Sequence, residues 1–296
     1  MPSRPALGSG ATIACVAPAS PAFDRSLVSA GITALEAEGY RPVVQADRRD
    51  GHLAGSAGER AAELEAAFAD PAVDAVICVR GGYGSGQLLP LLDLERIAAG
   101  GKPLIGMSDI THLHVPLAAA GGSCVWGPML VRHGAAGDYT ASAFRKALSG
   151  RAYTVLAATA STVTMVPGRV RAPLTGGTTS ILCATLGTPW ELDTEGRLLL
   201  LEEVGEEPYR IDRLLTQLSQ AGKLAAAAGF VVSEHHDCAP ARPERSQTLM
   251  EVLRRHLEPL GKPCLYGLPL GHGEHLASVP FGIPVVLDAG DGMLHC

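Results

Sequence analysis

One serine of the chain stands in a context where a nucleophile could work. The segment from Lys102 to His114 reads KPLIGMSDITHLH, and its serine, Ser108, follows a short apolar run and a glycine. The pattern predicts a strand, a sharp turn and a helix, as in the nucleophile elbow of serine hydrolases, where following backbone N–H groups can stabilise an oxyanion. The second glycine of that motif is Ile110 here, and Ser108 with Asp109 also suits a helix N-cap. The segment alone leaves both interpretations open.

A glycine-rich loop is the second candidate for a site. It runs from Arg80 to Gly86, reads RGGYGSG, and directly follows the apolar run 75–79. Glycines after a strand let backbone N–H groups approach an anion, either a phosphate or a transition-state oxyanion. The spacing fits neither the GxGxxG of dinucleotide-binding folds nor the GxxxxGK(S/T) of a P-loop. The structural alternative is an ordinary tight connection.

Two segments farther along the chain place an acid and a histidine in unusual surroundings. Glu202 directly follows the leucine run 198–201, although it and the nearby Glu203 could also belong to a solvated acidic turn. His272 lies between two glycines in the segment GLPLGHG, which begins at Gly267. From the residues alone, the solvated turn is the simpler interpretation of Glu202, and no other histidine of the chain lies between two glycines.

The sequence also contains one candidate cluster of metal ligands. Glu234, His235, His236 and Asp237 follow one another directly after a short apolar run. Adjacent loop histidines are common, and the spacing fixes no third ligand. We therefore expect no metal site.

Strands and helices alternate along the first half of the chain. This alternation predicts an α/β fold with a parallel sheet covered by helices, and ligand sites beyond the carboxyl ends of its strands. The turn at Ser108 and the glycine-rich loop both lie at such positions. The predicted strands are 12–17, 42–45, 75–79 and 104–105, and the predicted helices are 26–38, 59–68 and 110–117.

Composition and charge narrow the classes of function. The 296 residues are 47% hydrophobic, which suits one large domain or two of ordinary size. The formal net charge of −6 comes from 24 basic and 30 acidic residues that are well mixed, without the basic stripe of a nucleic-acid binder. We expect no signal peptide and no membrane span, and hence a cytoplasmic protein. The seven cysteines form no CxxC pair and are expected to be buried free thiols.

The composition and pattern of the sequence change near Arg132. The following stretch holds one helix-like segment and polar turns, and residues 152–171 are mostly small or β-branched. We therefore predict a domain over 1–135 that carries the nucleophile, a linker over 136–172, and a C-terminal domain over 173–296 that carries Glu202 and His272.

Six segments occur in an order that resembles a known family. They are RGGYGSGQLLPLLD from Arg80, KPLIGMSDITHLH from Lys102, GPM from Gly127, LTGGTTSIL from Leu174, LLLLEEVGEEPYRIDRLLTQL from Leu198, and GLPLGHG from Gly267. With these segments the sequence resembles the LD-carboxypeptidase family of serine peptidases, which includes muramoyltetrapeptide carboxypeptidases and microcin-immunity peptidases. The resemblance implies a Rossmann-like N-terminal domain with a parallel sheet and a smaller, mainly β C-terminal domain.

The resemblance also implies roles for individual residues. Ser108 matches the nucleophile, Glu202 the acid and His272 the base. The backbone N–H groups of Gly82 and Asp109 match the oxyanion hole. The residues that we assign to substrate binding are Arg80, Gly81 and Tyr83.

The implied reaction is hydrolysis of an L,D peptide bond in muropeptides, which releases terminal D-alanine for recycling and needs no cofactor. One alternative is a microcin-immunity-type amide hydrolase that acts on peptidyl-nucleotide conjugates. Another is a non-catalytic α/β protein whose glycine loop binds phosphate. The chain departs from the family pattern at Met107, Thr178 and residues 234–236, which bears on specificity more than on chemistry. A further family motif, which could form surface ion pairs or a homodimer interface, comprises Tyr209, Arg210, Asp212 and Arg213.

Overall fold

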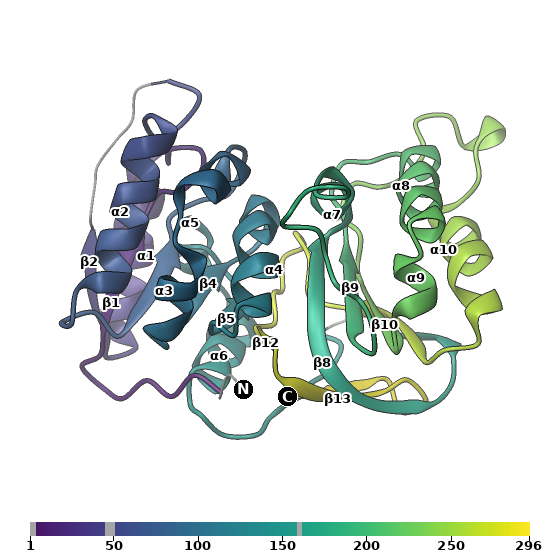
Figure 1. Cartoon of the computed structure of the whole chain (residues 1–296). Helices are drawn as coiled ribbons and strands as arrows, with labels where there is room; N and C mark the ends of the chain where they lie inside the picture. Colours follow the sequence, from purple (N-terminus) through teal and green to yellow (C-terminus); the bar gives the residue numbers. More distant parts are fainter. Residues whose placement is uncertain (1–3, 45–50, 159–161) are drawn as a thin grey trace. The chain divides into compact units, whose positions relative to one another are not determined.

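The computed structural model describes residues 4–44, 51–158 and 162–296, which fold into two compact units (Figure 1). The first unit comprises the chain up to Arg151 together with Ala277–Gly282. The second unit comprises Ala152–Leu276 and Ile283–Cys296. The chain therefore returns briefly to the first unit close to its C-terminus.

The first unit is built on a mainly parallel sheet. Its strands follow the order β12-β5-β4-β3-β1-β2, and neighbours run parallel except for β12, which is antiparallel to β5. This arrangement confirms the predicted α/β fold. The expected strand 42–45 corresponds to β2, and Gln45 lies outside the described residues. The strands are β1 (Thr12–Val16), β2 (Arg41–Val44), β3 (Ala75–Cys78), β4 (Leu104–Gly106), β5 (Cys124–Trp126) and β12 (Val279–Phe281).

Helices connect and cover these strands. The central strands β3, β4 and β5 are buried along their whole length, as continuous apolar runs in covered parallel sheets are. Helix α1 packs against α5, whereas α2, α3 and α4 form a second packed group. A capping box fixes the start of α2, because Ser56 and Glu59 exchange side-chain-to-backbone hydrogen bonds. The helices are α1 (Arg25–Ala37), α2 (Ala57–Ala69), α3 (Leu94–Ala99), α4 (Thr111–Ala119), α5 (Leu130–His133) and α6 (Asp138–Ala147), with 3₁₀ helices η1 (Ser85–Leu91) and η2 (Ser108–Ile110).

The second unit is built on a mixed sheet in the order β6-β14-β13-β8-β9-β10-β11-β7. Strands β8 to β11 run parallel, and the remaining strands are antiparallel to their neighbours. This sheet confirms the expected second, mainly β region. The strands are β6 (Thr154–Val155), β7 (Val163–Val166), β8 (Arg169–Thr178), β9 (Leu198–Glu202), β10 (Gly229–Ser233), β11 (Cys264–Leu268), β13 (Pro284–Asp288) and β14 (Met293–His295).

Strand β8 is long and bends along its course (Figure 1). Its first half pairs with β13, and its second half pairs with β9. Helix α8 packs against α7, α9 and α10. The helices are α7 (Thr179–Ala184), α8 (Pro208–Gln220), α9 (Lys223–Ala226) and α10 (Leu249–Leu257), with 3₁₀ helices η3 (Pro243–Arg245) and η4 (Glu258–Leu260). Helix α6 and strands β6 and β7 thus occupy much of the stretch 136–172 that the sequence predicted as a linker.

Two further expectations concern the chain as a whole. All seven cysteines are buried and free, as predicted. Among the described residues, no helix is both long and apolar enough to cross a lipid bilayer.

Candidate functional site

Ser108 occupies a strained turn between β4 and the helices that follow. Its φ angle is 62°, in the left-handed region that an L-residue other than glycine enters at a cost of about 1–2 kcal/mol. Its side chain is partly exposed, whereas Met107 and Asp109 on either side are buried. The residues at the N-cap positions of η2 and α4 are Met107 and Ile110, so Ser108 is not a helix cap. A strained serine between a strand and a helix is the geometry of a nucleophile elbow.

A second feature of this turn explains the glycine before it. A Cβ at Gly106 would lie 3.1 Å from side-chain carbons of Ile110, so a larger residue at position 106 would require the Ile110 side chain to shift by a few tenths of an ångström. Ile110, which replaces the second glycine of the hydrolase motif, therefore packs against the first one.

The glycine-rich loop lies directly beside Ser108. Strands β3 and β4 are parallel neighbours, so the segments that follow them share one edge of the sheet. A Cβ at Gly81 would lie 3.3 Å from the Ser108 Cβ and 3.4 Å from the Asp109 nitrogen. Gly82 has φ 90°, and a Cβ there would lie 2.7 Å from Ser20 Oγ. Glycine at position 81 lets the loop backbone approach Ser108 closely, and glycine at position 82 lets it approach Ser20.

Buried polar groups hold the loop in place. The Ser20 nitrogen donates to the Gly81 carbonyl at 3.1 Å, and Ser20 Oγ accepts from the Tyr83 nitrogen at 3.2 Å. Arg60 is almost fully buried, and its Nη1 donates to the Gly84 carbonyl at 2.8 Å and to the carbonyl of Pro18 at 2.6 Å. Burial lowers the pKa of Arg60, and these carbonyl dipoles compensate its charge. The loop is thus fixed from two sides.

Asp109 ties the far end of the loop to the serine turn. Its Oδ2 accepts from the Ser85 nitrogen at 2.8 Å, and its carbonyl accepts from Ser85 Oγ at 2.6 Å. Burial favours the neutral acid, but hydrogen bonds from His112 and Ser85 outweigh that effect, so the pKa of Asp109 is lower than usual. The carboxylate is therefore structural, while the backbone N–H of Asp109 stays beside Gly81.

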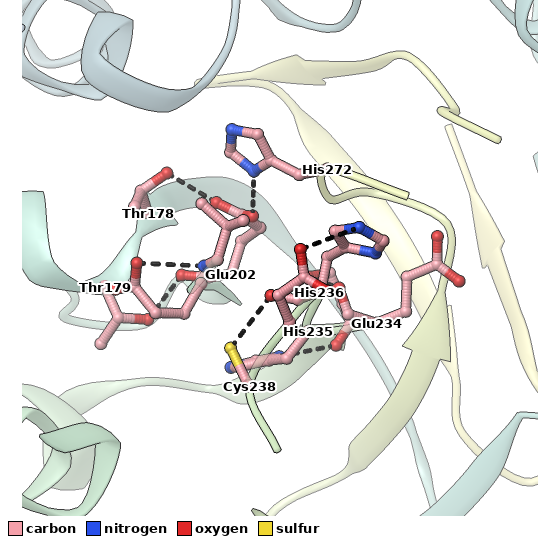
Figure 2. A network of polar contacts seen from close by, with 12 residues as sticks. Thr178, Thr179, Glu202, Glu234, His235, His236, Cys238 and His272 are labelled. Atoms are coloured by element: carbon pink, nitrogen blue, oxygen red, sulfur yellow. Dashed lines mark hydrogen bonds and ion pairs between the residues drawn. The ribbon is translucent and has the colours of Figure 1, made fainter. Parts of the chain in front are cut away.

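The second unit brings the predicted acid and histidine together. Glu202 ends β9 and is fully buried, which excludes the solvated turn considered for it. Its Oε1 lies 2.7 Å from His272 Nδ1, and its Oε2 accepts from Thr178 Oγ1 at 2.6 Å (Figure 2). Thr178 is opposite Glu202 in the parallel pairing of β8 with β9. A carboxylate bound at Nδ1 leaves Nε2 of the imidazole to accept a proton.

Two glycines allow His272 to take this position. A Cβ at Gly271 would lie 2.6 Å from the backbone carbonyl oxygen of Glu234. A Cβ at Gly273 would overlap the carboxylate of the same residue, which is the flexible end of a side chain. The backbone on either side of His272 therefore passes close to the end of β10.

Glu203 is buried but has different partners from its neighbour. Its Oε2 accepts from the Ser180 nitrogen at 2.8 Å, near the N-terminus of α7, and its Oε1 accepts from the Val204 nitrogen at 3.2 Å. Burial raises the pKa of Glu203 to about 7, and the nearby charge of Glu202 adds to the rise. Glu202 and Glu203 therefore point to opposite faces, as successive strand residues do.

The histidines after β10 do not form a metal site. His235 Nδ1 lies 3.0 Å from the Ser233 carbonyl, and burial lowers the pKa of this imidazole. His236 Nε2 lies 3.3 Å from Asp237 Oδ2 on the surface. Within 4–44, 51–158 and 162–296, no three His, Cys, Asp or Glu side chains are grouped so as to hold a metal ion.

The family motif on α8 lies partly on the surface. Tyr209 is half-exposed, and the guanidinium groups of Arg210 and Arg213 each lie 5.7 Å from its ring centre. Asp212 binds His256 Nε2 at 2.6 Å. Ion pairs and ring contacts therefore account for these side chains within the chain.

Sequence reasoning missed several residues that build the site. It noted Thr178 only as a departure from the family pattern, and it gave no role to Ser20 or Arg60. The alignment of Thr178 with Glu202 could have been inferred only from the register of two strands. The contacts of Ser20 and Arg60 with the glycine loop join segments far apart in the sequence, for which the sequence carries no local signal.

Comparisons with known proteins agree with this architecture. A unit with a serine on a strained strand-to-helix turn and a unit with a buried Glu–His pair are features of serine hydrolases. Residues 13–127 match the model of the LD-carboxypeptidase N-terminal domain, and residues 171–287 match that of the LD-carboxypeptidase C-terminal domain. The chain belongs to the LD-carboxypeptidase family.

Individual relatives cover almost the whole chain. A probable murein peptide carboxypeptidase of Bacillus subtilis is 36% identical over 97% of this chain and 91% of its own length. The murein tetrapeptide carboxypeptidase of Pseudomonas aeruginosa is 32% identical, over 93% and 92%. The crystal structure of muramoyltetrapeptide carboxypeptidase from Oxalobacter formigenes superposes with a TM-score of 0.84 at 28% identity, over 96% and 97%. The microcin C7 self-immunity protein shares the fold, with a TM-score of 0.90 at 22% identity, over 100% and 98%.

Proposed function

We propose that this chain is a serine carboxypeptidase that hydrolyses an L,D peptide bond in murein tetrapeptides and releases the terminal D-alanine. The observation that carries the proposal is the left-handed conformation of Ser108 beside the glycine loop, because strain of this kind is retained where a hydroxyl must be presented to a substrate. The names of the relatives from Bacillus subtilis, Pseudomonas aeruginosa and Oxalobacter formigenes support this choice of substrate.

In the proposed mechanism Ser108 Oγ attacks the carbonyl before the terminal residue, and Nε2 of His272 takes its proton. Glu202 fixes the tautomer of His272 and stabilises the imidazolium that forms. The backbone N–H groups of Gly82 and Asp109 stabilise the oxyanion. The C–N bond breaks as His272 returns the proton to the leaving amine, which departs as D-alanine. Water then hydrolyses the acyl-enzyme by the same route in reverse, so no cofactor takes part.

Active-site labelling and product analysis test this proposal. A fluorophosphonate should label the wild type and not Ser108→Ala, and mass spectrometry should detect free D-alanine from a murein tetrapeptide. We expect Ser108→Ala to lose ~10⁴-fold or more of kcat, and Glu202→Gln to lose ~10²- to 10⁴-fold. Gln substitutions at Glu203, Glu206 and Glu207 should each stay within about tenfold of wild type. An unlabelled, inactive wild type that nucleotides stabilise against heat would instead favour a phosphate-binding protein.

Two control experiments test whether the nucleophile is a metal-bound water and whether the preferred substrate is a peptidyl-nucleotide. Prolonged EDTA treatment should leave activity unchanged, and zinc-restored activity would point to a metal-bound water as the nucleophile. Preferential cleavage of a peptidyl-nucleotide amide over the tetrapeptide would favour the immunity-type activity.

Location and assembly belong to the same proposal. A protein that recycles murein peptides would meet them in the cytoplasm, which cell fractionation tests. Sedimentation analysis tests the predicted homodimer.

A further inference from the structure

Arg80 has an environment that the proposed reaction does not yet explain. It directly precedes Gly81, whose backbone lies against Ser108. Its Nη1 donates to the Pro21 carbonyl at 3.3 Å, and its Cζ lies 5.0 Å from the centre of the Phe23 ring. In the described part of the chain, no carboxylate lies within ion-pair distance of Arg80. Arg96, by contrast, pairs with Glu65 at 3.0 Å. The guanidinium therefore keeps most of its five N–H donors for another partner.

The segment that supports Arg80 is itself fixed to the glycine loop. Ser20 binds the backbone of Gly81 and Tyr83, and the Pro21 carbonyl accepts from Arg80, so hydrogen bonds join the segment that precedes Phe23 to the loop after β3. Phe23 is 65% exposed, so its ring contributes little to the core. A ring placed against a guanidinium restricts the arginine to a few conformers and leaves its donor edge open.

The substrate of a carboxypeptidase presents a matching group. In a peptide with a C-terminal residue, the terminal carboxylate carbon lies three bonds, roughly 4 Å, from the scissile carbonyl carbon. That carbonyl must reach the hydroxyl of Ser108, so the carboxylate lies within the span of an arginine that starts one residue before Gly81. A planar guanidinium is the side chain that best binds a carboxylate through two parallel hydrogen bonds.

We propose that Arg80 binds the terminal carboxylate of the substrate and that Phe23 is the positioning residue that holds its guanidinium. The proposal rests on the proposed carboxypeptidase function and adds the group that restricts cleavage to the chain end. Arg80 contacts the substrate, whereas Phe23 acts through Arg80.

The test compares a murein tetrapeptide that has a free C-terminal carboxylate with the same peptide as its C-terminal amide. We expect the wild type to favour the acid by ~10²-fold or more in kcat/KM, because the amide leaves a charged donor pair unmatched. Arg80→Ala should lose ~10²-fold on the acid and less than about threefold on the amide, and Arg80→Lys should fall between because it lacks the bidentate fork. Arg96→Ala removes an exposed arginine of the same unit and should match the wild type on both peptides.

Phe23 is tested by two substitutions. Phe23→Leu should raise KM for the acid by ~3- to 10-fold with little change in kcat or in the amide reaction, since only the placement of Arg80 is affected. Phe23→Tyr keeps an aromatic face and should restore the wild-type KM. Equal losses on acid and amide for Arg80→Ala, or equal KM values for Phe23→Leu and Phe23→Tyr, would overturn the assignment.

Binding separates this proposal from the proposed function. In a Ser108→Ala background, calorimetry should show tighter binding of the acid than of the amide, and Arg80→Ala should abolish the difference. Such selectivity in the absence of wild-type hydrolysis would refute the carboxypeptidase function and support the carboxylate receptor. Hydrolysis by the wild type with equal binding of acid and amide would refute the receptor and support the enzyme.

Discussion

The hydroxyl of Thr178 offers a direct test of how the acid is held. Glu202 is fully buried, and its Oε2 accepts from Thr178 Oγ1 while its Oε1 faces His272. Thr178→Val keeps the side-chain shape but leaves a buried carboxylate oxygen without this donor. The carboxyl group then rotates toward another donor, and this change weakens its bond to Nδ1. A hydrogen bond to a charged group contributes about 1.5–3 kcal/mol, which corresponds to a ~10- to 100-fold lower kcat if it is lost in the transition state.

Steady-state kinetics on one tetrapeptide measures this effect. We expect KM for Thr178→Val to change less than about threefold, because the lost interaction acts on the acid rather than on the substrate. Thr178→Ser keeps the hydroxyl and should retain most of the activity. Thr179→Val is the matched control, since Thr179 Oγ1 donates at 3.0 Å to the backbone carbonyl of Glu202 and not to its carboxylate. Wild-type kcat for Thr178→Val, or an equal loss for Thr179→Val, would refute the reasoning.

Three further predictions follow from strain, charge and close contact. In urea unfolding, Ser108→Gly should be as stable as Ser108→Ala or up to ~1 kcal/mol more stable, because glycine relieves the left-handed backbone at φ 62°. A clearly higher stability of Ser108→Ala would argue against backbone strain at this residue. The pKa of Glu203 is raised from 4.5 to about 7, so the folded state binds a proton at Glu203 more tightly than the unfolded state does. The free energy of unfolding should therefore fall by up to roughly 3 kcal/mol as the pH rises from 4.5 through about 7. Glu203→Gln should remove most of this fall in stability, whereas Gln at the exposed Glu195 should leave it in place. Identical curves of stability against pH for the wild type and Glu203→Gln would contradict the raised pKa of Glu203. Gly271→Ala should lower kcat by ~10²-fold, because its Cβ would meet a backbone oxygen. Gly273→Ala should stay within about tenfold of the wild-type kcat, because its Cβ meets only a flexible carboxylate. A larger loss for Gly273→Ala than for Gly271→Ala would be inconsistent with these two contacts.

The sequence predicts the reactive elements because local patterns encode them. An apolar run followed by glycine and serine predicts the turn at Ser108, and the leucine run before Glu202 predicts a buried strand with an acid at its end. The structure places these elements as expected, with the glycine loop and the serine turn after neighbouring strands. The side-chain alternation that separates Glu202 from Glu203 also follows from strand geometry alone.

Contacts between distant segments could not be predicted in this way. No local pattern indicates that Val279–Phe281 pairs with β5, because a three-residue strand carries little periodicity. No local pattern indicates either that Arg60, in the first turn of the amphipathic helix α2, reaches the Gly84 carbonyl. An arginine at such a position is usually solvated, and only the fold reveals the carbonyl groups that permit its burial.

The two units position their reactive groups by the same physical means. In each, the group lies at or just after the carboxyl end of a parallel strand, and glycines lie close to it. In each, a buried polar side chain supplies the rigidity, Arg60 for the loop beside Ser108 and Thr178 for the carboxylate of Glu202. These arrangements oppose folding, since a left-handed serine and buried charges both lower stability. Their presence at the predicted catalytic residues therefore supports the chemistry proposed for those residues.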